Sequence, residues 1–127
     1  MLIADLYTAG ALDIAADETI AEAAIRLREN DVSSLAVMDG EQLVGIVTER
    51  DIVQATADGA NPRRTAVQAY MATEPVTASP DEDTVVVAAR MLDSGVRHLP
   101  VVTGGRVVGM ISVRDLVALE SLPGWAR

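Results

Sequence analysis

The chain has 127 residues, half of them hydrophobic, a formal net charge of −9, no cysteine and no lysine. This length fits one compact globular unit or two very small ones, and the hydrophobic fraction argues against a disordered chain. The missing residue types exclude a disulfide framework, a thiolate zinc site, a P-loop lysine and a Schiff base, and the acidic charge argues against nucleic acid as a partner.

The first half of the chain predicts a strand, a helix, a hairpin and a second helix. The strand is expected near Leu12–Ala15, and a helix from about residue 18, where apolar residues recur at helical spacing. Two apolar runs, Leu35–Met38 and Leu43–Val47, flank an Asp-Gly pair, which is typical of a β-hairpin. The second helix is expected to begin at Thr48, a good N-cap residue.

The second half repeats this order. VSSLAVMDGEQLVGIVTERDIV and VRHLPVVTGGRVVGMISVRDLV, residues 32–53 and 96–117, align without a gap at an offset of 64 with nine identities. Upstream, we expect a one-residue slip between the copies, a strand near Val76–Ala78 and a helix from about residue 82. The predicted fold is therefore α/β (α+β), with two β-α-β-β-α repeats packed as a pseudo-two-fold symmetric module.

The predicted domain boundaries follow the repeats. Residues 1–60 form the first domain, 61–69 the linker, 70–122 the second domain and 123–127 a tail that contains Trp125. The segment 57–64 between the repeats is polar and holds Gly and Pro, as is typical of a linker. The sequence has no signal-like segment and no apolar run near the roughly 20 residues that span a bilayer. We therefore expect a cytoplasmic protein that does not contact a membrane.

Each repeat passes from its last strand into its last helix through the pattern G-x-x-[S/T]-x-x-D. The pattern is formed by Gly45, Thr48 and Asp51 in the first repeat and by Gly109, Ser112 and Asp115 in the second. A structural interpretation is that the hydroxyl and the aspartate cap the helix, while the glycine relieves crowding in the strand. A functional interpretation is that the helix start binds phosphate, the carboxylate holds a ribose and the glycine lets a ligand approach. Arg50 and Arg114 could then reach a phosphate.

The two repeated strings, with Met71–Thr77 and Pro80-Asp81, resemble CBS domains, the family named from cystathionine beta-synthase, over about residues 3–120. The resemblance implies a regulatory module, not an enzyme, that binds AMP, ADP, ATP or S-adenosylmethionine in clefts between two domains. It implies no required cofactor, a homodimer formed through helical faces, and a separate protein that the module regulates.

The resemblance also implies which residues contact the ligand. They are Thr48, Arg50, Asp51, Val76, Thr77, Arg97, His98, Leu99, Pro100, Ser112, Arg114 and Asp115. Asp13-Ile14 and Ser34-Leu35-Ala36 would line the adenine side of the first cleft. We prefer the second cleft, because the opening Asp5–Ala11 fits the family pattern poorly and residues 65–127 carry a net charge of −2 against −7 for residues 1–64.

Plainer interpretations stay open for several residues. Arg97 and Arg106 can belong to a solvated face, and His98 is expected to be a hydrogen-bonded edge residue, since no convergent partners suggest a metal site or a general base. A competing function is a ligand-free dimerisation scaffold in which the aspartates are helix caps only. A hydrolase that uses Asp51 or Asp115 is the third class, which slow turnover of a bound nucleotide would support.

Overall fold

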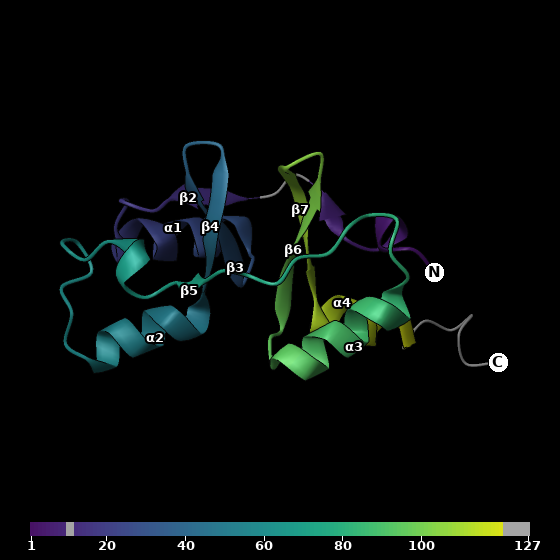
Figure 1. Cartoon of the computed structure of the whole chain (residues 1–127). Helices are drawn as coiled ribbons and strands as arrows, with labels where there is room; N and C mark the ends of the chain where they lie inside the picture. The colour runs from purple at the N-terminus through teal and green to yellow at the C-terminus, as the bar shows by residue number, and fades with distance from the viewer. Residues whose placement is uncertain (10–11, 121–127) are drawn as a thin grey trace. The chain divides into compact units, whose positions relative to one another are not determined.

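The computed structural model describes residues 1–9 and 12–120, which belong to two compact units (Figure 1). Unit 1 consists of Met1–Ala11 and Val76–Arg127, and unit 2 of Leu12–Pro75. Unit 2 contains β2 (Asp13–Ala15), α1 (Ile20–Asn30), β3 (Ser34–Asp39), β4 (Gln42–Thr48), α2 (Glu49–Ala57), a 3-10 turn (Val67–Ala69) and β5 (Ala72–Thr73). Unit 1 contains a 3-10 turn (Ile3–Asp5), β1 (Thr8–Ala9), α3 (Thr84–Ser94), β6 (His98–Thr103), β7 (Arg106–Ser112) and α4 (Val113–Glu120).

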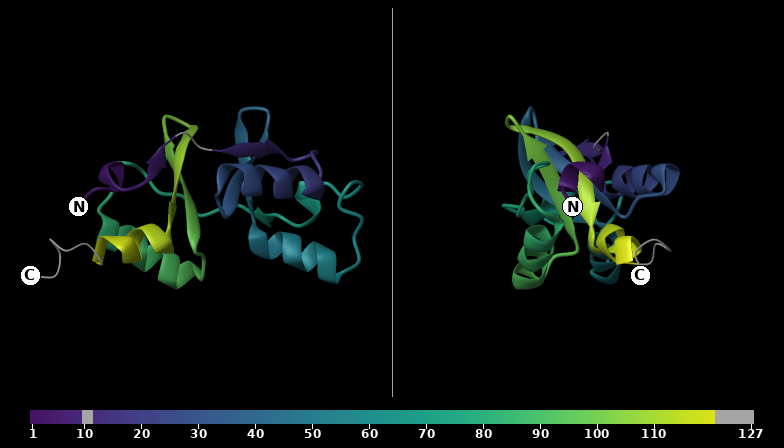
Figure 2. Two further views of the ribbon diagram at one scale, coloured as in Figure 1. Left: turned by 180° about the vertical axis from the view of Figure 1, so that it is seen from behind. Right: turned by 90° about the vertical axis from the view of Figure 1, so that its right-hand side faces the viewer.

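Each unit is built around an antiparallel hairpin and has its own core. The hairpins β3–β4 and β6–β7 were predicted from the sequence and are confirmed, with two-residue turns at Gly40-Glu41 and Gly104-Gly105. In unit 1 both helices lie at the end of the hairpin opposite its turn (Figure 2). The buried core of unit 2 comprises Ile14, Ala23, Leu27, Leu35, Val37, Val47 and Val67. That of unit 1 comprises Ile3, Ala78, Val87, Met91, Leu99, Val101 and Ile111.

The two compact units differ in their bounds from the domains 1–60 and 70–122, joined by the linker 61–69, that the repeats predict. Ile3 is fully buried in the core that the second repeat builds. The segment expected to be a linker lies along α1, where the backbone N–H of Ile20 donates to the carbonyl of Thr65 at 2.9 Å. Val67 is also fully buried. The segment between the repeats is thus an integral part of unit 2.

Two short strands complete the sheets reciprocally. Strand β1 pairs antiparallel with β7, with Ala9 opposite Gly109, and β5 pairs antiparallel with β4, with Thr73 opposite Gly45. The two pairs are equivalent, because Ala9 and Thr73, like Gly45 and Gly109, are 64 residues apart. The short strand at the start of each repeat therefore completes the unit that the other repeat forms. Strands of two residues carry no periodicity, and the sequence pattern did not reveal this exchange.

The close approach of β5 explains the first glycine of the repeated pattern. A Cβ atom at Gly45 would lie 2.7 Å from the carbonyl oxygen of Ala72 and 2.6 Å from the Sδ of Met71. Such separations lie inside van der Waals contact, so only glycine fits beside β5. Crowding by a neighbouring strand therefore accounts for Gly45 without a ligand.

The expected one-residue slip between the repeats is wrong. Helices α1 and α3 begin at Ile20 and Thr84, which are 64 residues apart, like the hairpins that follow. The buried residues of the two helices also match without a slip, since buried Leu27 corresponds to buried Met91 at the same offset. Both helices begin two residues later than predicted, because Thr19 and Asp83 are the N-caps and Glu18 pairs instead with Arg26.

The strand expected at Val76–Ala78 does not form as a strand; only a parallel bridge from Ala78 to Val101 is present. In unit 2 the corresponding strand β2 pairs with β3, and the N–H of Ala36 donates to the carbonyl of Leu12 at 3.1 Å. Pro100 stands at the position of Ala36 and has no N–H to donate. The second repeat therefore lacks the bond that would extend the pairing toward Val76.

Candidate functional site

The repeated pattern forms a closed helix cap in unit 1. Strand β7 ends at Ser112 and α4 begins with the next residue. Oδ2 of Asp115 accepts from the backbone N–H of Ser112 at 2.8 Å and from its hydroxyl at 3.0 Å. The hydroxyl in turn accepts from the N–H of Asp115 at 3.2 Å. The structural interpretation of the pattern as a capping box is confirmed here.

Unit 2 contains the same cap at the start of α2. Oδ2 of Asp51 accepts from the backbone N–H of Thr48 at 2.8 Å and from its hydroxyl at 3.2 Å, which closes a capping box. All four side chains of the two caps are half-buried. Aspartate thus performs the role usually filled by glutamate or glutamine, because its shorter side chain still reaches the N-cap N–H.

The caps leave one carboxylate oxygen available on each aspartate. Both hydrogen bonds to Asp115, and both to Asp51, are accepted by Oδ2, and over residues 1–9 and 12–120 no hydrogen bond to either Oδ1 is found. An ionised carboxylate can accept several hydrogen bonds. Capping and ligand binding are therefore compatible, and the cap holds the carboxylate in one orientation before a ligand arrives.

The sheet brings further predicted residues to the cap of unit 1. His98, the first residue of β6, lies directly opposite Ser112. The backbone N–H of Val113 donates to the carbonyl of Arg97 at 2.9 Å, so the segment before β6 is tied to the first turn of α4. Arg97 and Arg114 are exposed, and neither makes an ion pair in the described part of the chain. The backbones of Arg97 and Arg114 thus lie next to the cap of unit 1.

Four more of the residues predicted to contact the ligand lie in β6 or beside it. The bridge from Ala78 to Val101 places Val76 and Thr77 beside Leu99 and Pro100. Leu99 and Pro100 are fully buried in unit 1. The carbonyl of Thr77 already accepts from Nη1 of Arg90 at 2.9 Å. A role of these four residues in ligand binding stays a prediction.

The predicted residues are divided between the units. Thr48, Arg50 and Asp51 lie in unit 2, where Thr48 is opposite buried Ser34 and Asp13 is opposite Ala36. The other nine lie in unit 1. The clefts expected between the two repeats stay a prediction. Trp125 and the tail lie outside the described residues.

A pair of arginines missed by the sequence analysis supports the segments beside each cap. Arg90 donates through Nη1 to the carbonyl of Thr77 and forms an ion pair with Glu82. In the same way, Arg26 donates through Nη1 to the carbonyl of Asp13 and forms an ion pair with Glu18. Hydrogen bonds from Arg90 lower the pKa of the Glu82 carboxyl and raise that of the guanidinium. The recurrence of Glu and Arg at the offset of 64 was visible in the sequence, but the expected slip concealed it.

Among residues 1–9 and 12–120, no three histidine or acidic side chains gather as metal ligands would. Within the same part of the chain, every helix is too short or too polar to cross a bilayer.

The family model of the CBS domain matches residues 3–58 and 67–121. The chain therefore belongs to the CBS domain family, as a tandem pair of such domains. An uncharacterised 17.7 kDa protein of Acidianus ambivalens is 38% identical over 100 residues, which are 77% of this chain and 60% of that protein. The chain spans 60%, 54% and 33% of the length of three such curated relatives.

Solved structures of CBS domain pairs have the same fold. The CBS domain pair of protein MJ0100, in complex with 5′-methylthioadenosine and S-adenosyl-L-methionine, is 29% identical with a TM-score of 0.86, and the match covers 95% of this chain and 96% of that one. A hexameric CBS-CP12 protein from bloom-forming cyanobacteria is also 29% identical, with a TM-score of 0.86, over 92% of this chain and 69% of that one. The predicted fold class is thus confirmed.

Proposed function

We propose that the chain is a regulatory module that binds an adenosine-containing small molecule, AMP, ADP, ATP or S-adenosylmethionine, at the caps of α4 and α2. The observation that carries the proposal is the duplicated cap, in which each aspartate is fixed through Oδ2 while Oδ1 accepts no bond in the described chain. A ribose offers two hydroxyl donors for such an oxygen. The cap of unit 1 is the preferred site.

Each residue of the preferred site has a chemical role. Asp115 accepts from the ribose hydroxyls, and the hydroxyl of Ser112 can turn from Asp115 toward a sugar or phosphate oxygen. Arg97 and Arg114 donate to phosphate or carboxylate oxygens of the ligand. The helix start adds a positive partial charge. The two arginines favour an anionic ligand over a neutral nucleoside.

The similarity to MJ0100 supports the ligand class. That pair was solved with two adenosyl compounds, and its fold covers 95% of this chain. At 29% identity the choice among adenosyl compounds does not transfer. The proposal therefore names the adenosine moiety, which the caps can recognise, and leaves the remainder of the ligand to the experiment below.

The proposal describes a sensor without catalytic activity of its own. A ligand changes such a module only by binding one of its arrangements better than another. The output requires a partner, and we propose self-association into a homodimer together with a separate regulated protein. The hexameric CBS-CP12 protein is one relative of known assembly. The cytoplasmic location predicted from the sequence remains a prediction.

The second candidate function is a ligand-free scaffold. It is favoured by the closed capping boxes, in which both aspartates already have partners within their own helix starts. On this account Asp51 and Asp115 only stabilise helices, and association through the exposed helical faces is the whole function.

Thermal unfolding of the purified chain with AMP, ADP, ATP and S-adenosylmethionine, each tested alone, separates the two candidates. A ligand at about 100 times its Kd stabilises by about 2.7 kcal/mol, which raises Tm by several degrees. We expect one compound to do so, and Asp115→Ala to abolish the rise measured against its own ligand-free Tm. Asp93→Ala, at an exposed acidic residue on α3, is the control.

No rise with any compound at millimolar concentration would reject the adenosyl proposal in favour of the scaffold. A rise that survives in Asp115→Ala but not in Asp51→Ala would move the site to unit 2.

A further inference from the structure

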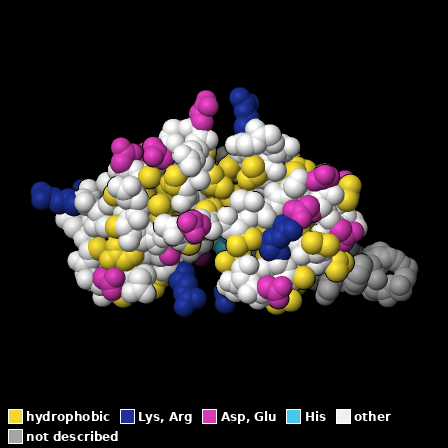
Figure 3. All heavy atoms as spheres, in the orientation of Figure 1, with side chains coloured by type: hydrophobic (Ala, Val, Ile, Leu, Met, Phe, Trp, Pro, Cys, Tyr) yellow, Lys and Arg dark blue, Asp and Glu magenta, His cyan; other side chains and the backbone are white. Residues whose placement is uncertain are grey.

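An apolar patch lies on unit 1 where α3 begins. It is formed by four hydrophobic residues, each 45–74% exposed: Met1, Leu2, Val85 and Val86. Leu2 forms a bridge with Asp83, and the backbone N–H of Thr84 donates to the carbonyl of Met1 at 2.9 Å, so the four residues are neighbours. Figure 3 shows hydrophobic side chains at the surface over α3. A contiguous exposed patch of this kind marks a surface that binds something.

The duplication shows how the corresponding surface of unit 2 is covered. The counterparts of the patch at the offset of 64 are all half-buried: Thr65, Ala66, Ala21 and Glu22. The segment 58–64, which follows α2, lies against them. The backbone N–H of Ala21 donates to the carbonyl of Pro62 at 2.9 Å. In unit 2, therefore, the chain that leaves the second helix returns to the start of the first.

Residues 121–127 hold the same place in the sequence of the second repeat. They lie outside the described residues, and at the offset of 64 they correspond to residues 57–63. Helices α3 and α4 run in opposite directions, so α4 ends on the side of unit 1 where α3 begins (Figures 1 and 2). The chain thus leaves α4 on the side that carries the patch.

We propose that residues 121–127 fold back over the start of α3 of the same chain and place Trp125 on the patch. A packed tryptophan side chain buries about 150–250 Å². Pro123-Gly124 stands between Leu122 and Trp125, and this pair favours a type II turn that reverses the chain. Five extended residues span up to about 18 Å, whereas packed helices lie about 8–10 Å apart. Trp125 can therefore reach α3 from the end of α4.

Charge favours the same contact. The start of α3 is acidic, with Asp81 and Asp83 exposed, and the only charged side chain of the segment is Arg127. A segment of the same chain also meets the patch at a high effective concentration, which a separate molecule lacks. In unit 1 the N–H of Val85 already donates to Oδ1 of Asp83 at 2.8 Å. The segment is therefore expected to bind through side chains and not through the backbone bond seen in unit 2.

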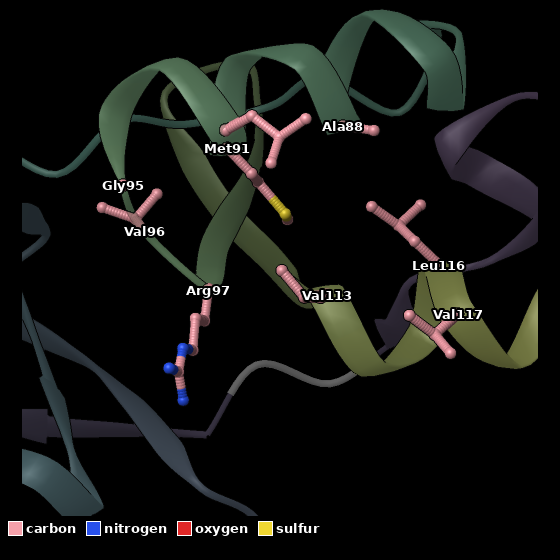
Figure 4. Close-up of a pocket in the computed structure, with 9 residues that line it drawn as sticks. Ala88, Met91, Gly95, Val96, Arg97, Val113, Leu116 and Val117 are labelled. Atoms are coloured by element: carbon pink, nitrogen blue, oxygen red, sulfur yellow. The ribbon is translucent and has the colours of Figure 1, made fainter.

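A groove of about 430 Å³ between α3 and α4 is the other apolar surface to consider in the described part of unit 1 (Figure 4). Met91 and Val113 point into the space between the helices, and Leu92 on the lining is 83% exposed (Figure 4). The comparison with unit 2 favours the patch over this groove, because Pro62 is bonded to the start of α1 and not farther along that helix. Leu92 then serves as a control position.

The inference does not depend on a ligand, and it adds an internal contact to the module. The patch adjoins the ion pair that supports the candidate site. The backbone N–H of Ile3 donates to the carbonyl of Glu82 at 2.9 Å, and Glu82 pairs with Arg90, which holds the carbonyl of Thr77. A segment over the patch thus covers this support.

Fluorescence gives the first test, because Trp125 is the only tryptophan. We expect acrylamide to quench the folded full chain at least about twofold less than the urea-unfolded chain, since the patch shields the indole from water. The protection should not depend on protein concentration. Equal quenching of the folded and unfolded chains would overturn the inference. Protection that appears only as concentration rises would assign Trp125 to a second copy and overturn it as well.

Two matched arginine variants separate the patch from the groove. Val85→Arg and Leu92→Arg both change exposed aliphatic residues of α3. We expect Val85→Arg to raise the quenching of Trp125 to the value of the unfolded chain, and Leu92→Arg to leave it unchanged. Protection lost only in Leu92→Arg would place Trp125 in the groove. That result, equal loss in both variants, or protection kept in both would overturn the inference.

Disulfide formation gives the second test, because the chain has no cysteine of its own. Ala126 and Val85 correspond to Pro62 and Ala21, which are bonded in unit 2. Since a disulfide requires Cα atoms within about 7 Å, we expect Val85→Cys/Ala126→Cys to oxidise within one chain at least about tenfold faster than Leu92→Cys/Ala126→Cys. Equal rates, or a product with the mass of two chains, would overturn the inference.

Discussion

Arg90 makes in the second repeat the contacts that Arg26 makes in the first. Each guanidinium donates to the carbonyl 13 residues earlier, at 2.9 and 2.8 Å, and to the glutamate eight residues earlier. The pair ties α3 to the segment that lies beside β6, and α1 to β2. Since that segment borders the candidate site, these ion pairs position backbone that a ligand is proposed to meet.

The ion pair of Glu82 predicts a specific acid sensitivity. Arg90 lowers the pKa of the Glu82 carboxyl below its ordinary value of 4.5, so the unfolded chain binds the proton more tightly than the folded one. The stabilisation is complete above pH 4.5 and is lost as pH falls through the lower folded pKa. We expect Glu82→Gln to reduce the free energy of unfolding by about 1 kcal/mol at pH 7, with the difference from the wild type narrowing toward pH 3.

Urea titrations at several pH values measure this difference. Glu41→Gln, at the exposed β3–β4 turn, controls for the loss of one charge. A difference that stays constant down to pH 3 would show that Glu82 stabilises by packing alone.

The capping aspartates predict a cost to stability that separates from binding. Asp51→Ala and Asp115→Ala each remove the carboxylate oxygen that accepts two hydrogen bonds at one cap, so each should lower the free energy of unfolding by about 0.5–2 kcal/mol. Asp115→Asn keeps a side-chain acceptor for the N–H of Ser112 and should lose less. Denaturant midpoints check this order, and equal losses for Asp115→Asn and Asp115→Ala would argue that the charge, not the hydrogen bond, stabilises the cap.

The contact of β4 with β5 predicts that Gly45→Ala destabilises unit 2. The added Cβ would meet the carbonyl oxygen of Ala72 at 2.7 Å, and a backbone atom cannot move aside as a side chain can. We expect a loss of about 1–3 kcal/mol in chemical denaturation. Met71→Ala should not rescue it, because the carbonyl remains. Full rescue would assign the clash to the Met71 side chain instead.

Exchange of Pro100 and Ala36 tests why the repeats pair differently. Ala36→Pro removes the N–H that donates to Leu12 and leaves that carbonyl without its partner, at a cost of about 1–3 kcal/mol. Pro100→Ala supplies the missing donor in unit 1. Hydrogen exchange should then show a protected amide at residue 100, and rapid exchange there would mean that something other than proline prevents the pairing.

The sequence by itself determined the repeats, the hairpins and the helix starts at the caps. Those features depend on local rules: an Asp-Gly or Gly-Gly turn between apolar runs, a hydroxyl and an aspartate three residues apart, and apolar residues at helical spacing. Because these signals lie within a few residues of each other, Thr48, Asp51, Ser112 and Asp115 could be selected from the sequence. The charge contrast between the halves was visible there too.

Only the tertiary structure decided which segments meet. The reciprocal pairing of β1 with β7 and β5 with β4 joins segments far apart in the chain, through strands of two residues that have no pattern of their own. The absent strand at Val76 depends on the N–H that Pro100 lacks, a property of its neighbour across the sheet. The apolar groove lined by Met91, Val96 and Leu116 exists because α3 and α4 meet in space. Such features follow from contacts between distant residues, which local periodicity does not encode.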